Sequence, residues 1–153
     1  MKKITREELD QILQQHQLWL DNNGDKGERA VFNSANLSNT SFRGANLRLA
    51  NLSGANLIGA DISRTDLQGA NLQGADLIDV HLQNTDLRIA NLQDANLQGG
   101  NLYGADLRNA WFNTNIRDCS SFRSAKFTSD ALPWLILHPK WSAVKDTVRI
   151  EHT

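Results

Sequence analysis

The chain has 153 residues and a nearly balanced charge, with 16 Lys and Arg against 17 Asp and Glu. This length suits one domain, and the balance gives no electrostatic reason to expect a nucleic acid or an anionic membrane as a partner. The single cysteine, Cys119, excludes a disulfide within the chain. No apolar segment has the length of a secretory signal or a membrane span, so we expect a cytoplasmic protein without membrane contact.

An amphipathic helix is predicted over residues 5 to 20. Thr5 and Glu8 have the spacing of a capping box, and the sequence Asn-Asn-Gly at 22–24 is typical of a helix end. One apolar stripe contains Leu9, Ile12, Leu13, His16, Trp19 and Leu20. We expect residues 1–29 to form an N-terminal helical cap on the next segment; a partner-binding helix is the alternative.

Residues 30 to 129 repeat every five residues. From Phe32 to Phe127, nineteen of the twenty positions spaced by five hold Leu, Ile or Phe, and Arg117 is the exception. Two residues earlier, thirteen of the twenty positions are Ala. Five residues of an α-helix leave a drift of about 140°, and five residues of a strand reverse the face, so neither element gives one apolar side. The repeat therefore predicts short extended pieces joined by turns, with the small residue and the leucine pointing inward.

A second period of twenty residues lies above the first. Asp66, Asp86 and Asp106 recur at this spacing, as do Arg88 and Arg108. Twenty residues are four pentapeptides, which predicts a coil with four walls. Glycine is frequent at the second turn residue of each repeat, where a turn can require positive φ.

The run Ala45-Asn46-Leu47 and its many equivalents closely resemble the pentapeptide repeat proteins, and the resemblance covers residues 30 to 129. The segment from Trp19 through Gly27 to Ala30 is similar to cyanobacterial members of that family. The resemblance implies an all-β solenoid, a right-handed quadrilateral β-helix, and twenty repeats would make about five coils. It implies a shape more than a function, since many members have no assigned activity.

The inward positions define the predicted core, with phenylalanine confined to the two end coils. Arg117 does not suit the interior, so we expect a bulge near Asn115 and Ile116. The predicted structural core includes Phe32, Phe42, Leu47, Leu52, Leu57, Leu72, Leu77, Leu92, Leu107, Phe112, Phe122 and Phe127.

Residues 130–153 lose the repeat and are predicted to form a short C-terminal cap. Pro133 and Pro139 limit any helix there, and Val148 and Ile150 alternate as in a strand. The alternative is a self-association surface, because some family members dimerise through this end. The protein is thus expected to be a monomer or a dimer through its C-terminal end.

Two groups of outward residues have some potential for chemistry. Asp66, Asp86 and Asp106 are expected beside an arginine ladder, which favours a neutralised charge network over a cation site. His81 is expected next to Asp61 of the preceding coil, but general-base catalysis also needs a nucleophile and a pocket. We therefore expect no catalytic residue, no metal and no cofactor, and a buried or idle thiol at Cys119.

Apolar side chains at outward positions mark the expected contacts. Ile58 and Ile78 are predicted to stack on one wall, facing solvent. The candidate protein contacts are Ile58, Ile78, Trp134 and Trp141.

The prediction for function is a non-enzymatic structural or protein-interaction module with an unidentified protein partner. One alternative is a DNA mimic that binds DNA gyrase, as some family members do. Residues 30 to 129 carry eight Asp and eight Arg or Lys, which disfavours mimicry because that role needs an acidic surface. The other alternative is an enzyme with a site in the caps.

Overall fold

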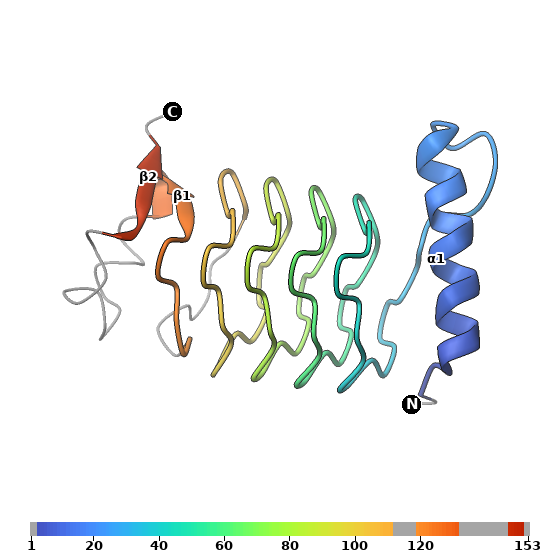
Figure 1. The fold of residues 1–153 in the computed structure, drawn as a ribbon, viewed down its shortest axis with the longest axis horizontal. Helices are drawn as coiled ribbons and strands as arrows, with labels where there is room; N and C mark the ends of the chain where they lie inside the picture. Colours follow the sequence, from blue (N-terminus) through green and yellow to red (C-terminus); the bar gives the residue numbers. More distant parts are fainter. Residues whose placement is uncertain (1–2, 112–118, 132–146, 152–153) are drawn as a thin grey trace.

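The computed structural model describes residues 3–111, 119–131 and 147–151. Helix α1 spans Arg6–Asp21, strand β1 spans Lys126–Thr128, the 3-10 helix η2 spans Ser129–Ala131, and strand β2 spans Arg149–Glu151. Between α1 and β1 the chain forms a stack of coils, with α1 across one end and the two strands at the other (Figure 1). Phe112, Trp134 and Trp141, together with the bulge expected near residue 116, lie outside the described residues.

Parallel backbone bridges join residues twenty positions apart along the stack. One wall runs from Val31 through Asn51, Asn71 and Asn91 to Trp111 in this way. From Phe32 to Leu92, the N–H of each large inward residue donates to a carbonyl of the next coil, as Phe32 does to Asn51 at 2.7 Å. The bridges place four pentapeptides in each coil, and neighbouring coils are held by main-chain hydrogen bonds at every wall.

Every corner from residue 34 to residue 109 has positive φ at its second turn residue, as does the corner at Ser124. Glycines adopt this conformation, such as Gly69 with φ of 66°, but so do residues with side chains, such as Leu49 at 61° and Ile89 at 60°. Asn and Asp occupy several of the others and accept the left-handed region at low cost.

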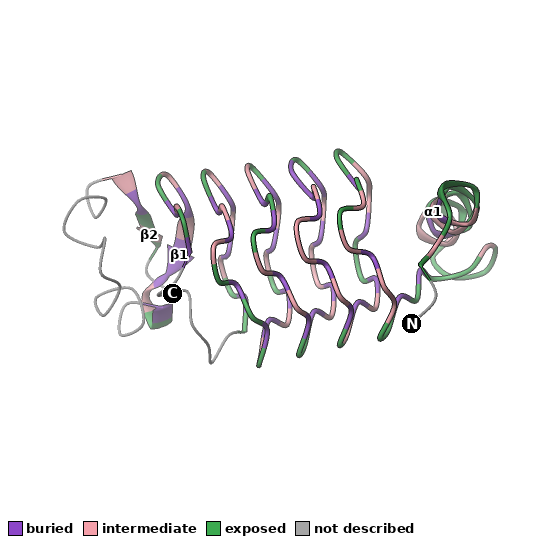
Figure 2. Cartoon of the chain, turned by 90° about the horizontal axis from the view of Figure 1, so that it is seen from below, coloured by how far each residue is buried: buried purple, intermediate pink, exposed green. Residues whose placement is uncertain are grey.

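The interior contains one small and one large side chain from each wall. Of the predicted core, the eleven described members are all buried: Phe32, Phe42, Leu47, Leu52, Leu57, Leu72, Leu77, Leu92, Leu107, Phe122 and Phe127. Figure 2 shows the buried positions recurring from coil to coil. Each fully buried leucine or phenylalanine stabilises the fold by about 1.5–3 kcal/mol, so these columns are its main source of stability.

Buried threonines add polar links inside the stack. The Thr65 and Thr85 hydroxyls donate to the carbonyls of Phe42 and Ile62 at 2.9 and 2.7 Å. A threonine thus replaces alanine at the small inward position without leaving its hydroxyl unpaired.

Helix α1 begins at the predicted capping box, in which Thr5 and Glu8 exchange side-chain and backbone hydrogen bonds. Leu9 is fully buried against the core, and Ile12 and Leu13 pack partly buried beside it. His16 is also buried, and its Nδ1 accepts a hydrogen bond from the Ala30 N–H at 3.1 Å. This bond ties the helix to the residue at which the first coil begins.

At the other end, β2 pairs in parallel with β1, with Phe127 opposite Ile150. Because Lys126 itself bridges to Asp106, β2 continues one wall of the stack by another strand. The Arg108 guanidinium spans this junction, binding Asp106 at 2.6 Å and Glu151 at 2.8 Å. Within the described part of the chain, no helix is long and apolar enough to cross a membrane.

Candidate protein-interaction surfaces

The Asp66–Asp86–Asp106 column is a neutralised charge ladder. Asp86 and Asp106 each bind their own arginine, Arg88 and Arg108, at 2.6 Å. Burial alone would raise the pKa of Asp86, but hydrogen bonds from the Arg88 side chain and backbone hold that pKa below its ordinary value. Asp86 and Asp106 are therefore ionised and paired. Among the residues that the structure describes, no three His, Cys, Asp or Glu side chains gather as they would around a metal.

The Asp61 and His81 pair lies beside a shallow pocket of about 230 Å³. The Ser63 hydroxyl is buried there, donates to Asp61 at 2.6 Å and accepts from Arg43 at 3.1 Å. Burial opposes ionisation of Asp61, but the Ser63 hydrogen bonds and the Arg43 charge lower its pKa overall. Ser63 is thus bonded to an ionised carboxylate and an arginine. The repeat pattern places Ser63 at an outward turn position, so the sequence alone does not predict that this residue is buried.

The structure corrects the expected exposure of Ile58 and Ile78. They do stack in consecutive coils, where the N–H of Gly59 donates to the Ile78 carbonyl at 2.9 Å. Both side chains are nevertheless half-buried, because like residues about 4.8 Å apart cover one another. The pair is therefore a weaker candidate for a contact than the sequence indicates.

A different corner carries two exposed aliphatic side chains, while the exposed Val31, Tyr103 and Trp111 lie elsewhere on the shaft. Leu49 is 45% and Ile89 is 55% exposed, and Gly69 lies between them in the intervening coil. The Leu49 side chain leans over Gly69, since a Cβ added to that glycine would lie 2.8 Å from Leu49 Cδ2. We call Leu49, Gly69 and Ile89 the apolar corner. It is diagonally opposite the corner of Ile58 and Ile78, because the two sets of turns are ten residues apart in a twenty-residue coil.

Both large residues of the apolar corner have left-handed backbone conformations. A left-handed L-residue costs roughly 1–2 kcal/mol, and a β-branched residue such as Ile89 rarely adopts it. Two apolar side chains thus lie where the backbone disfavours them and where solvent reaches them. The sequence holds this signal, because Leu49 and Ile89 are the large apolar residues at a repeat position that, from residue 34 to residue 109, otherwise holds Gly, Asn, Asp, Ser or Arg.

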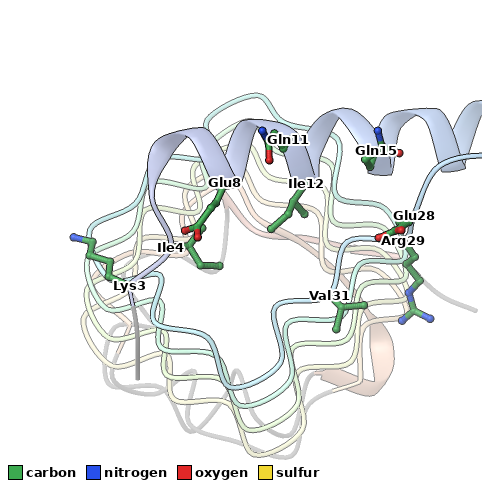
Figure 3. Close-up of a pocket in the computed structure, with 9 residues that line it drawn as sticks. All are labelled: Lys3, Ile4, Glu8, Gln11, Ile12, Gln15, Glu28, Arg29 and Val31. Atoms are coloured by element: carbon green, nitrogen blue, oxygen red, sulfur yellow. The ribbon is translucent and has the colours of Figure 1, made fainter.

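The second surface is a groove of about 630 Å³ between α1 and the first coil. We call it the end groove; it is lined by Lys3, Ile4, Glu8, Ile12, Arg29 and Val31, among others. Ile4, Ile12 and Val31 border the opening from different sides (Figure 3). Val31 is apolar and 53% exposed, whereas the equivalent residues in the later coils are mainly Asn. The volume lies within the range of ligand pockets.

His16 fixes the helix that forms one side of this groove. Burial lowers the pKa of His16 below its ordinary value, while the backbone of Arg48 acts in the opposite direction. The imidazole stacks on Trp19, with 5.8 Å between the ring centroids. His16 is therefore a buried, neutral histidine with a structural position.

Cys119 is buried, and its Sγ lies 3.5 Å from the Leu97 carbonyl oxygen. It occupies the interior near the point where Arg117 interrupts the repeat. This position fits the expected buried thiol.

The comparisons with known proteins identify the class of the fold. The family model described as pentapeptide repeats (8 copies) matches residues 30–69 and again residues 70–109, together more than half of the chain. The chain therefore belongs to the pentapeptide repeat family, whose members form right-handed β-helices. No curated protein matches it.

Solved structures of cyanobacterial pentapeptide repeat proteins resemble this chain. Rfr23 from Cyanothece 51142 is 34% identical, with a TM-score of 0.50, over 60% of this chain and 66% of that one. About a third of Rfr23 thus lies outside the alignment. The protein alr5209 from Nostoc PCC 7120 is 24% identical, with a TM-score of 0.54, over 90% of this chain and 93% of that one. The second likeness is one of fold alone.

Proposed function

We propose that the protein is a non-enzymatic interaction module, and that its apolar corner contacts a protein partner. The single observation that carries this proposal is the pair Leu49 and Ile89, exposed and left-handed on a surface of mainly polar turns. Strained backbone conformations persist where the surrounding structure holds them, and they concentrate at functional sites. The partner surface that fits is apolar at its centre.

The architecture supports this role by holding the corner rigidly. We infer about five right-handed coils, with α1 as the cap at one end and the C-terminal residues as the cap at the other. Such covers are needed because an open coil end leaves backbone groups unpaired and invites aggregation. A rigid support keeps the entropic cost of binding low, since few groups become ordered in the complex.

The alternatives have less support from the side chains. Enzymatic use of Ser63 would need its hydroxyl oxygen to reach a substrate, but Ser63 is buried and that oxygen accepts a hydrogen bond from Arg43. The Asp61 carboxylate that accepts the hydroxyl proton has a lowered pKa, which makes it a weak base. A DNA mimic would need unpaired acidic charge, but Asp86 and Asp106 are bound by arginines.

The test is capture from a lysate of the organism that encodes the chain. The bait is the wild type, a Leu49→Gly and Ile89→Gly variant, or an Ile58→Gln and Ile78→Gln control. Gly69 occupies the same turn position as Leu49 and Ile89, and Gln98 occupies the same turn position as Ile58 and Ile78. Each replacement is therefore a residue that the chain already has in that turn. We expect one protein to be retained by the wild type and the control and lost by the glycine variant. Equal retention by the wild type and the glycine variant would refute the proposal, and loss only with the control would move the contact to the opposite corner.

A further inference from the structure

The end groove contains an unpaired strand edge. In the next coil of this wall, the carbonyls of Asn51 and Ser53 accept hydrogen bonds from the N–H groups of Phe32 and Ser34 in the coil before it. The equivalent acceptors in the first coil are the carbonyls of Val31 and Asn33, which receive no hydrogen bond from another described residue. A backbone edge of this kind is a template for another extended segment.

The chain itself occupies the corresponding edge of the next wall. Lys3 bridges in parallel to Asn36, at the place where a preceding coil would lie. The first coil thus accepts an added parallel segment at one wall, and the Val31 edge offers the same geometry at the wall before it. There the groove separates the edge from Ile12 of α1 and leaves space of about 630 Å³.

We propose that the end groove binds an extended peptide segment of a partner protein, added as a parallel strand along residues 31–33. This inference rests on the proposed role as an interaction module, but it does not depend on the apolar corner. In this arrangement one partner residue lies opposite Val31. The N–H of the next partner residue donates a hydrogen bond to the Val31 carbonyl. Its side chain points toward the coil interior, as leucines do there, and meets Ile4 and Ile12.

The position of Lys3 limits the length of the bound segment. Val31 and Asn36 are five residues apart, so Lys3 stands five positions beyond the partner residue opposite Val31. A partner segment must therefore end or leave the groove within four residues of that point. The proposed ligand is a short extended stretch with a large apolar side chain, in the pattern small-polar-large.

The test uses a peptide with the sequence of residues 70–75, Ala-Asn-Leu-Gln-Gly-Ala, blocked at both ends. In the stack, Leu72 N–H donates to the Asn91 carbonyl, and Asn71 N–H donates to the opposite neighbour. In the groove, Leu72 N–H would donate to Val31, and Asn71 N–H would face solvent. A peptide N-methylated at Leu72 lacks the required donor, and one N-methylated at Asn71 is its matched control.

The measurement is a titration of the ¹⁵N-labelled full chain followed by amide chemical shifts. We expect saturable shifts at residues 31–33 and in α1 near Ile12, binding at least tenfold weaker after methylation at Leu72, and unchanged binding after methylation at Asn71. Saturable shifts away from these residues, no saturable shift, or equal effects of the two methylations would overturn the inference. The Leu49→Gly and Ile89→Gly variant should bind the peptide as the wild type does, so failure here leaves the capture experiment to test the apolar corner independently.

Discussion

Gly27 offers a direct test of how α1 is joined to the first coil. Its φ is 75°, and a Cβ there would overlap the Gln15 carbonyl and lie 2.7 Å from the Trp19 nitrogen. Both are backbone atoms of α1, so no side-chain rotation relieves the overlap. Gly27→Ala should therefore push the helix away from the segment that leads into the first coil.

Gly74 is the matched control, because its φ is 64° and an added Cβ meets nothing within 4 Å. Gly74→Ala should lower the free energy of unfolding by about 1 kcal/mol. The left-handed conformation costs alanine roughly 1–2 kcal/mol, and the lower entropy of alanine in the unfolded chain offsets part of this cost. Gly27→Ala carries the same terms plus an overlap of roughly 1–3 kcal/mol. Its total cost should be about 2–4 kcal/mol, if the helix stays attached.

The assay combines urea unfolding with hydrogen exchange of individual amides. We expect Gly27→Ala to lower protection in α1 around Leu9 more than in the middle coils, because the helix can detach while the stack remains. Gly74→Ala should not lower α1 protection selectively. Equal free-energy losses in the two variants, or unchanged protection in α1 of Gly27→Ala, would refute the steric argument.

Three other predictions concern side chains. Ile89→Gly, which copies Gly69 of the same corner, should change the free energy of unfolding by less than about 1 kcal/mol, because relief of strain offsets lost burial; a larger loss in urea unfolding would contradict the strain argument. Because burial lowers the pKa of His16 in the folded state, the unfolded chain binds more protons, and the free energy of unfolding should fall as the pH drops below about 6.5. A His16→Gln variant should lose this pH-dependent contribution. A pH profile of the variant like that of the wild type would contradict the prediction. Arg108→Ala should selectively lower exchange protection in β2, because the link to Glu151 is lost; unchanged protection there would show that strand pairing alone holds it.

Much of the stack was predictable because the five-residue period acts at every repeat. The inward leucines, the coil of twenty and the capping box of α1 depend on local spacing, which one sequence contains. The turns with positive φ were also visible, since glycine is frequent at that position and its side-chain substitutes keep the same conformation.

The interaction surfaces depend on contacts between coils and could not be obtained from that spacing. Ile58 and Ile78 stack on each other and are half-buried, whereas Leu49 and Ile89 are separated by Gly69 and are exposed. The end groove depends on where α1 crosses the first coil. The repeat does not encode that crossing, although the exposed valine at position 31 marks its edge.

The most direct test of the central claim measures folding and partner retention on the same Leu49→Gly and Ile89→Gly protein. The proposed role predicts a free energy of unfolding within about 2 kcal/mol of the wild type, from about 1 kcal/mol at each site, together with loss of the captured protein. Retention of that protein at the wild-type level by the folded variant would contradict the claim that the apolar corner is the binding surface.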